Sequence, residues 1–435
     1  MTFKITCNWL DKSPKPLADE LEVTLAAIRI LVGKENVTEF VPLVEGSLNR
    51  ASEQVSEKLH IPAYFIGEWL AENWWPLLFE PRKTEETGNR IYDARHSLIS
   101  AQHGFALPDL RIEPFGKAIQ ISCRGREMPL PEIRFRHSAH ETLARKSVRG
   151  VLATFVEACA SRLTACGVSG TPLQKAWAAV EETSPEEATF CALAGALGID
   201  PYSVSEATAA AIDEVHDLLG PTAALDFCMA SAEGDIADNR TLVSAVAKKL
   251  DGAHQITLAP LRNLRLPQDA LARPGWWRGK QTAVWAREHL DIKFSDQLGA
   301  DKFFEKLRIG TEPALFQNVD RIVFSGAVDR VEEDANIVLV QGQDEARRFA
   351  ACRAVFLAMD SEPKSRRIVT DTVTRDQQAS RAFAAEMLVP SDYLKSLSES
   401  GHISRDTIHQ VAHERRASVD AVRWQAVNNY LVAEA

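Results

Sequence analysis

Two helical segments near the carboxyl end of this 435-residue chain constrain its fold more than any other feature. The first, residues 347–359 (RRFAACRAVFLAM), is apolar after its two opening arginines except for one cation, Arg353. The second, residues 381–390 (RAFAAEMLVP), is also largely apolar, contains Glu386 and ends at a proline. Because a helix that is apolar on most faces has to be covered by other elements, an arginine in its middle needs a partner there. The two segments therefore predict a packed domain with charge buried inside it.

These segments resemble the active-site helices of ImmA/IrrE-type zinc peptidases. Residues 67–75 (GEWLAENWW) and 107–110 (LPDL) resemble the N-terminal region of that family's long bacterial form. In that family the first helix carries His-Glu-x-x-His and usually begins at an Arg-Phe pair, which stands here at residues 348–349. The two histidine positions hold Arg353 and Leu357. The general-base position holds Ala354, and the third ligand position, a Glu in the family, holds Ala379. Since none of these side chains can bind zinc or act as a base, the resemblance implies a zincin-like domain without metal, cofactor or catalysis.

Arg353 stands where the resemblance implies a metal dication. We expect it to pair with a carboxylate of the second helix or its approach, Asp376 and Glu386 being the candidates. Removing one partner of such a buried pair would cost about 3–5 kcal/mol. The same two acids are the nearest candidates for a hydrolase that uses a different constellation, which is one alternative function.

The degenerate domain is expected to span residues 311–435. Residues 321–325 and 335–341 are rich in β-branched side chains and predict two short strands joined by a polar turn. A helix that starts near Asp344 and a loop that contains Pro363 follow, before the second helical segment. The resemblance implies the same order of strands, helix, loop and helix.

Residues 403–427 predict a tail with helix-turn-helix spacing, in which Ser418 caps the second helix. Arg415, Arg416 and Arg423 lie where they could meet DNA phosphates. A DNA-binding transcriptional regulator is therefore a second alternative function. The formal charge of −10 argues against strong DNA affinity, and in the other interpretation the helices only cap the domain.

The N-terminal region, residues 1–145, is expected to be strand-rich. Alternating and β-branched segments predict strands at residues 21–32, 36–38 and 61–66, and residues 111–122 predict two strands that form a hairpin around a turn at Gly116. Between them lies a short tryptophan-rich helix, residues 67–76, with Trp69, Trp74 and Trp75. It is either a hydrophobic anchor between sheet and helix or an aromatic surface that binds a partner.

The middle region, residues 146–310, is expected to be a helical bundle. An apolar stripe marks one helix between residues 148 and 163, and capped starts mark two more after Thr171 and Ser184. A further helix opens at 273–280 (RPGWWRGK). Its paired tryptophans are expected to pack into the core, although the cations beside them could instead hold an acidic partner.

Composition limits the environment of the protein. There is no apolar run of bilayer-spanning length, and residues 1–9 turn polar at once, as a signal peptide would not. The seven cysteines are widely spaced without a Cys-x-x-Cys motif, which is typical of reduced thiols. We therefore expect a cytoplasmic protein with no membrane partner.

Together these observations predict an α+β protein with three domains. The function expected from the resemblance is that of a catalytically inactive, peptidase-like regulatory protein that binds a protein partner. ImmA/IrrE relatives act on repressors and stress responses, often on mobile elements, so the resemblance implies a partner in repressor control or in a defence system. The DNA-binding regulator and the unconventional hydrolase remain the alternatives.

Overall fold

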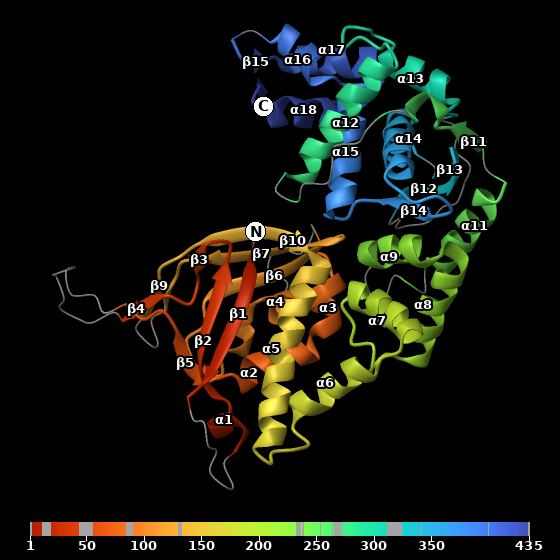
Figure 1. Ribbon diagram of the computed structural model, residues 1–435. Helices are drawn as coiled ribbons and strands as arrows, with labels where there is room; N and C mark the ends of the chain where they lie inside the picture. The colour runs from red at the N-terminus through yellow and green to blue at the C-terminus, as the bar shows by residue number, and fades with distance from the viewer. Residues whose placement is uncertain are drawn as a thin grey trace. The chain divides into compact units, whose positions relative to one another are not determined.

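The chain folds into two compact units, Met1–Ser205 and Glu206–Ala435 (Figure 1). A computed structural model describes residues 2–10, 19–42, 55–83, 90–128, 133–231, 236, 239–252, 254–262, 264, 271, 273–310, 324–340, 342–398 and 400–433. Several antiparallel sheets occur together with many helices, so the expected α+β class is confirmed.

The first unit combines three small sheets with helices. Its strands are β1 (Phe3–Trp9), β2 (Leu25–Val32), β3 (Glu35–Asn36), β4 (Phe40–Pro42), β5 (Leu59–Pro62), β6 (Asp109–Phe115), β7 (Ala118–Arg124), β8 (Glu127–Met128), β9 (Ile133–Phe135) and β10 (Ala139–Ala144). Its helices are α1 (Glu20–Val23), α2 (Tyr64–Glu72), α3 (Trp74–Phe79), α4 (Arg90–His96), the 3-10 helix η2 (Leu98–Ala101), α5 (Arg145–Ala165), α6 (Pro172–Glu182) and α7 (Pro185–Leu197). The strand orders are β1-β2-β3 with β5 also on β2, β10-β7-β6, and β4-β9-β8.

Local signals account for much of this unit. The expected hairpin at 111–122 forms between β6 and β7, where Gly116 takes a φ of 73° that favours glycine. Capping boxes start α6 and α7, at Thr171 and Ser184, as expected. The strand expected at 61–66 is wrong beyond Pro62, because the chain turns into α2 at Tyr64.

The three tryptophans of α2 and α3 lie inside the first unit. Trp69, Trp74 and Trp75 are only 1–7 % exposed. The indole of Trp69 donates a hydrogen bond to the Ala94 carbonyl at 2.9 Å, and that of Trp75 donates to the Tyr202 hydroxyl at 3.1 Å. The anchor interpretation fits this burial. The expectation of an aromatic partner-binding surface is corrected, because these rings are used to hold helices to the core.

The second unit contains a four-stranded sheet and the two helical segments singled out above. Its strands are β11 (His254–Thr257), β12 (Phe324–Val331), β13 (Asp334–Leu339), β14 (Arg366–Thr370), β15 (His402–Ile403) and β16 (Val432–Ala433). Its helices are α8 (Glu206–Leu219), α9 (Pro221–Ala230), α11 (Arg240–Leu250), η3 (Ala259–Leu261), α12 (Gly275–His289), α13 (Gly299–Leu307), α14 (Asp344–Met359), α15 (Arg375–Leu388), α16 (Ser391–Leu397), α17 (Arg405–Arg415) and α18 (Val419–Asn428).

The sheet has the order β11-β13-β12-β14 and is antiparallel throughout. The expected pair of strands forms as the β12–β13 hairpin, although β12 begins at Phe324 and residues 321–323 of the expected strand lie outside the described ranges. The helix at Asp344 is confirmed. In contrast, the segment expected to be a loop contains β14. Helix α14 contacts the sheet, α15 packs on α14, and α12 packs on α15 (Figure 1).

The predicted domain boundaries at 145 and 310 do not follow the compact units. Helix α5 contributes Val148 and Leu152 to the same core as the N-terminal sheets. Likewise, Ala283 of α12 and Phe303 of α13 share one core with α14 and α15. Both predicted boundaries would therefore cut through a continuous apolar core, and a single domain boundary falls after Ser205 instead.

Candidate functional site

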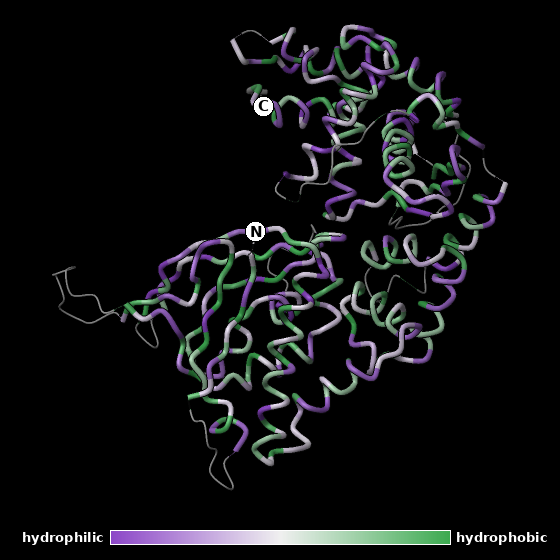
Figure 2. The backbone as a smooth tube through the Cα atoms, in the orientation of Figure 1, coloured by the Kyte–Doolittle hydropathy of each residue, from purple (hydrophilic) through white to green (hydrophobic). Residues whose placement is uncertain are grey.

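Helix α14 is buried along most of its length, and three of the four positions that the resemblance assigns to zinc ligands and base lie on it. Its backbone is coloured mostly green, for apolar residues, in Figure 2. Arg353, Ala354 and Leu357 are each at most 2 % exposed, as is Ala379 of α15. The described part of the chain holds no group of three or more His, Cys, Asp or Glu that could bind a metal ion. These positions are thus filled with the chain's own packed atoms.

Arg353 is held by polar groups of β14 and α15. Its guanidinium donates to the Ser380 hydroxyl at 3.1 Å, to the Gln377 side-chain carbonyl at 2.8 Å, and to the Thr370 main-chain carbonyl. It also forms an ion pair with Asp371 at 3.3 Å. Burial lowers the pKa of Arg353 to about 9, assisted by a nearby arginine and opposed by this carboxylate, so the group stays cationic at neutral pH.

The acid that pairs with Arg353 is not one of the two expected. Asp371 lies in the approach to α15, as expected of the partner, but its side chain is 96 % exposed. Asp376 lies instead within 3.4 Å of Arg367, in a buried network with Asp226. The expectation for Asp376 and Glu386 is therefore corrected, because both carboxylates are committed to other cations.

Glu386 ties the tail helices to α15. Its carboxylate accepts hydrogen bonds from the Ser391 main-chain nitrogen at 3.1 Å and from the Gln425 side chain of α18 at 2.8 Å. Arg287 of α12 lies 3.6 Å away. Burial raises the pKa of Glu386, while the Ser391 hydrogen bonds and the charges of Lys280 and Arg287 lower it. A carboxylate that is only 1 % exposed and held in this way joins α12, α16 and α18 to α15, and it is not exposed to a substrate.

The tail arginines are also largely committed. Arg415 is buried, donates to the Phe294 carbonyl at 3.2 Å and stacks over the Tyr393 ring. The expectation that Arg415 contacts DNA phosphate is therefore corrected, because its guanidinium faces the domain interior. Arg416 and Arg423 are about half exposed, but each forms an ion pair, with Asp344 at 2.7 Å and with Asp420 at 3.0 Å. The helix pair itself is confirmed, and Ser418 caps α18 as expected.

A cleft of about 610 Å³ lies between α12, α15 and α18. We call it the α12–α15–α18 cleft. Small side chains, Ala382, Ala385 and Ala421, leave room in it. Its lining includes four aromatic rings: Trp276, Phe349, Trp424 and Tyr430. Trp276 is 53 % exposed and Trp424 59 %. The expectation that the paired tryptophans of α12 pack into the core is therefore wrong for Trp276, while Trp277 is half-buried.

The charges of the cleft have one sign. Among the residues that the structure describes, Lys280 and Arg381 line it and no Asp or Glu side chain does. Within the described ranges neither cation forms an ion pair. Lys280 donates to the Asn429 side chain at 2.6 Å, and Arg381 donates to the Thr372 carbonyl at 2.9 Å. The cleft therefore combines apolar walls with positive charge, in a chain whose formal charge is −10.

Sequence reasoning found this cleft only in part. The cations beside the paired tryptophans at 276–277 were a recognisable signal for an acidic partner, and Lys280 indeed lines the cleft. Its neighbour Arg278 does not, because it is buried against Asp360 of α14. Trp424 and Arg381 were not identified, since nothing in their local sequence shows that α15 and α18 face α12.

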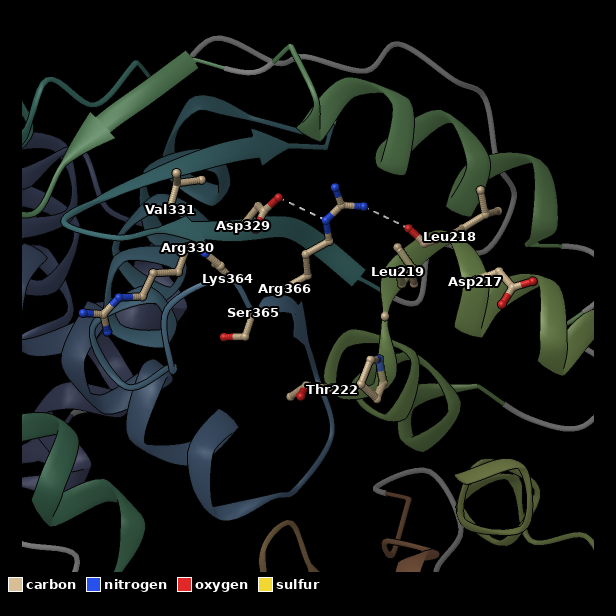
Figure 3. A pocket seen from close by; sticks show the side chains of 12 residues that line it. Asp217, Leu218, Leu219, Thr222, Asp329, Arg330, Val331, Lys364, Ser365 and Arg366 are labelled. Carbon is tan, nitrogen blue, oxygen red and sulfur yellow. Dashed lines mark hydrogen bonds and ion pairs between the residues drawn. The ribbon is translucent and has the colours of Figure 1, made fainter. Parts of the chain in front are cut away.

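Another pocket, of about 470 Å³, lies where the start of α9 meets β12 and β14 (Figure 3). Its prominent cation is Arg366. The dashed lines in Figure 3 show that Arg366 donates to Asp329 at 3.1 Å and to the Leu218 carbonyl at 3.0 Å. Asp251 lies 2.8 Å from the same guanidinium. The charge of Arg366 is therefore compensated by two carboxylates, although Arg330 and Lys364 also line this pocket. Among the described residues its lining contains no aromatic ring, unlike that of the α12–α15–α18 cleft.

No family of known proteins, no characterised protein and no solved structure matches this chain. Among the described residues, no helix has the length and apolar character needed to cross a membrane.

Proposed function

We propose that this chain is a catalytically inactive, peptidase-like regulatory protein that binds a protein partner through its second unit. One observation carries the proposal. The positions that resemble zinc ligands and base are filled by packed side chains, while the same two helices, α14 and α15, contribute to the lining of a cleft with exposed tryptophans. Exposed Trp, Tyr and Arg side chains around a hollow are typical of the residues that dominate protein–protein binding energy.

Packing explains why the missing catalytic groups would leave the fold intact. Ala379, the third ligand position in the resemblance, faces Gly279 of α12 so closely that a methyl group at Gly279 would lie 1.9 Å from the Ala379 carbonyl oxygen. Arg353 has its own hydrogen-bond partners. Core packing of this kind does not depend on a metal, so the domain can persist as a binding module.

The first test is metal analysis and peptide cleavage with the purified full-length protein. We expect no stoichiometric zinc and no turnover. The combined substitutions Arg353→His, Ala354→Glu and Leu357→His should not create a peptidase, because the third ligand position would still be an alanine. One tightly bound zinc per chain, or cleavage of a peptide that survives Arg353→Met, would contradict the proposal.

The second test is recovery of a partner from the native host by full-length protein and by a chain without residues 403–435. We expect the partner to be lost with the tail, because α18 forms one wall of the cleft. Salt-dependent DNA binding in place of a protein partner would instead support the DNA-binding alternative.

A further inference from the structure

The shape of the α12–α15–α18 cleft suits a side chain together with a short length of chain. Its volume of about 610 Å³ lies in the range of cavities that enclose small ligands or several side chains. Trp276 comes from α12 and Trp424 from α18, so rings from two helices are available to an inserted group. An aromatic or large aliphatic side chain is the natural occupant, because such groups bury the most apolar area.

The charge that lines the cleft is positive. Among the described residues, Lys280 and Arg381 are its charged lining side chains. Arg353 acts on Arg381 from behind the lining, and Arg287 shares Glu386 with Lys280. The carboxylates near these two inner cations, Asp371 and Glu386 together with Asp296 and Asp392, are not part of the lining. Partly buried charges are screened less by salt than exposed ones. The cleft should therefore attract an anionic group.

The amide side chains favour a peptide over a phosphate ligand. Gln378 and Asn428 line the cleft, and within the described ranges neither side chain forms a hydrogen bond. An amide offers both a donor and an acceptor, and a peptide main chain requires both. A phosphate group accepts hydrogen bonds only, so it would leave the amide oxygens unused.

We propose that the α12–α15–α18 cleft binds an acidic segment of a partner protein. A carboxylate of that segment approaches Arg381 and Lys280, and an aromatic or large aliphatic side chain lies against Trp276 and Trp424. This inference rests on the proposed function, because it names the chemistry of the partner that the second unit binds.

The test is selection of random twelve-residue peptides displayed on phage against the full-length protein. We expect enriched peptides to combine Asp or Glu with an aromatic or large aliphatic residue. Synthetic versions should bind about tenfold more weakly to Lys280→Gln and to Trp424→Ala than to the parent protein. Binding to these two variants should weaken further as the salt concentration rises. Lys395→Gln removes the same charge from an exposed ion pair on α16 and should bind as the parent protein does.

Charge exchange makes the test specific. Lys280→Glu should lose the acidic peptides and gain affinity for versions in which lysine replaces the acids. Enrichment of basic or neutral peptides, equal binding by Trp424→Ala, or displacement of the peptide by a labelled DNA duplex would overturn the inference. A native partner that is recovered equally well by Trp424→Ala and Lys280→Gln would also overturn it, while leaving the proposed function standing.

Discussion

Replacing Gly279 by alanine tests how closely α12 approaches α15. A methyl group at this position would lie 1.9 Å from the Ala379 carbonyl oxygen, whereas Cβ atoms essentially never come within 3.0 Å of another heavy atom. One turn earlier, a methyl group on Gly275 would lie 2.6 Å from the Arg375 carbonyl oxygen. Because the opposing atoms belong to the main chain, they cannot rotate away. The two helices would have to separate by about 1 Å.

The expected cost follows from two opposing effects. Overpacking a well-packed interior costs up to about 3 kcal/mol, and the better helix propensity of alanine returns roughly 1 kcal/mol. We therefore expect Gly279→Ala to lower the free energy of unfolding by about 2 kcal/mol. For a unit of this size that corresponds to a fall in Tm of roughly 4–8 °C, which calorimetry of the full-length chain would measure.

Gly150 provides the matched control. It lies inside helix α5, and a methyl group there would meet nothing within 4 Å. Gly150→Ala should therefore stabilise its unit by up to about 1 kcal/mol. If Gly279→Ala raised the Tm as Gly150→Ala does, α12 would not lie against Ala379, and the argument that packed atoms fill the space around Ala379 would fail.

The remaining predictions concern buried charge and metal. Arg353→Met should lower the free energy of unfolding by about 2–3 kcal/mol in chemical denaturation, because it leaves buried acceptors unpaired. Asp371→Asn should lower it by under about 1 kcal/mol, because that carboxylate is solvated. Equal losses of stability in the two variants would contradict this asymmetry. Burial would raise the pKa of Glu80, but hydrogen bonds from His96 and Arg95 lower it overall. The stabilisation that the Glu80 carboxylate contributes is therefore complete above the unfolded pKa near 4.3 and is lost as pH falls through the folded pKa. Glu80→Gln should flatten the acid-induced loss of Tm below pH 4.3, and an unchanged pH profile would refute this prediction. A chelator should leave the Tm of the purified protein unchanged, since no metal is expected to support the fold; a fall in Tm would show otherwise.

Elements set by neighbouring residues could be predicted from the sequence. The capped starts of α6, α7 and α18 depend on a Ser or Thr and the amides that follow it within one turn. The β6–β7 hairpin depends on Gly116 at its turn. Helix α14 is marked by its unbroken helix-forming composition. Strand β14 escaped prediction because Arg366 and Arg367 open it and only three β-branched residues follow.

The candidate site was less predictable, because its residues come from distant parts of the chain. That Arg353 is buried and needs partners follows from its apolar neighbours in the sequence. Which partners it finds does not, since the selection of Asp371 over Asp376 depends on where β14 and Arg367 lie. The cleft likewise requires Lys280 to lie beside Asn429, which is 149 residues away.

The sequence alone therefore determined the helices and turns, the absence of zinc-binding side chains at positions 353, 357 and 379, and the presence of a buried cation, because each depends on side-chain chemistry within a few residues. The tertiary structure alone decided the domain boundary after Ser205, the partner of Arg353 and the existence of the α12–α15–α18 cleft. The physical reason is that each depends on contacts between segments far apart in the chain, such as the close approach of α12 to α15 at Gly279, between two helices a hundred residues apart. Only the folded chain brings α12, α15 and α18 together.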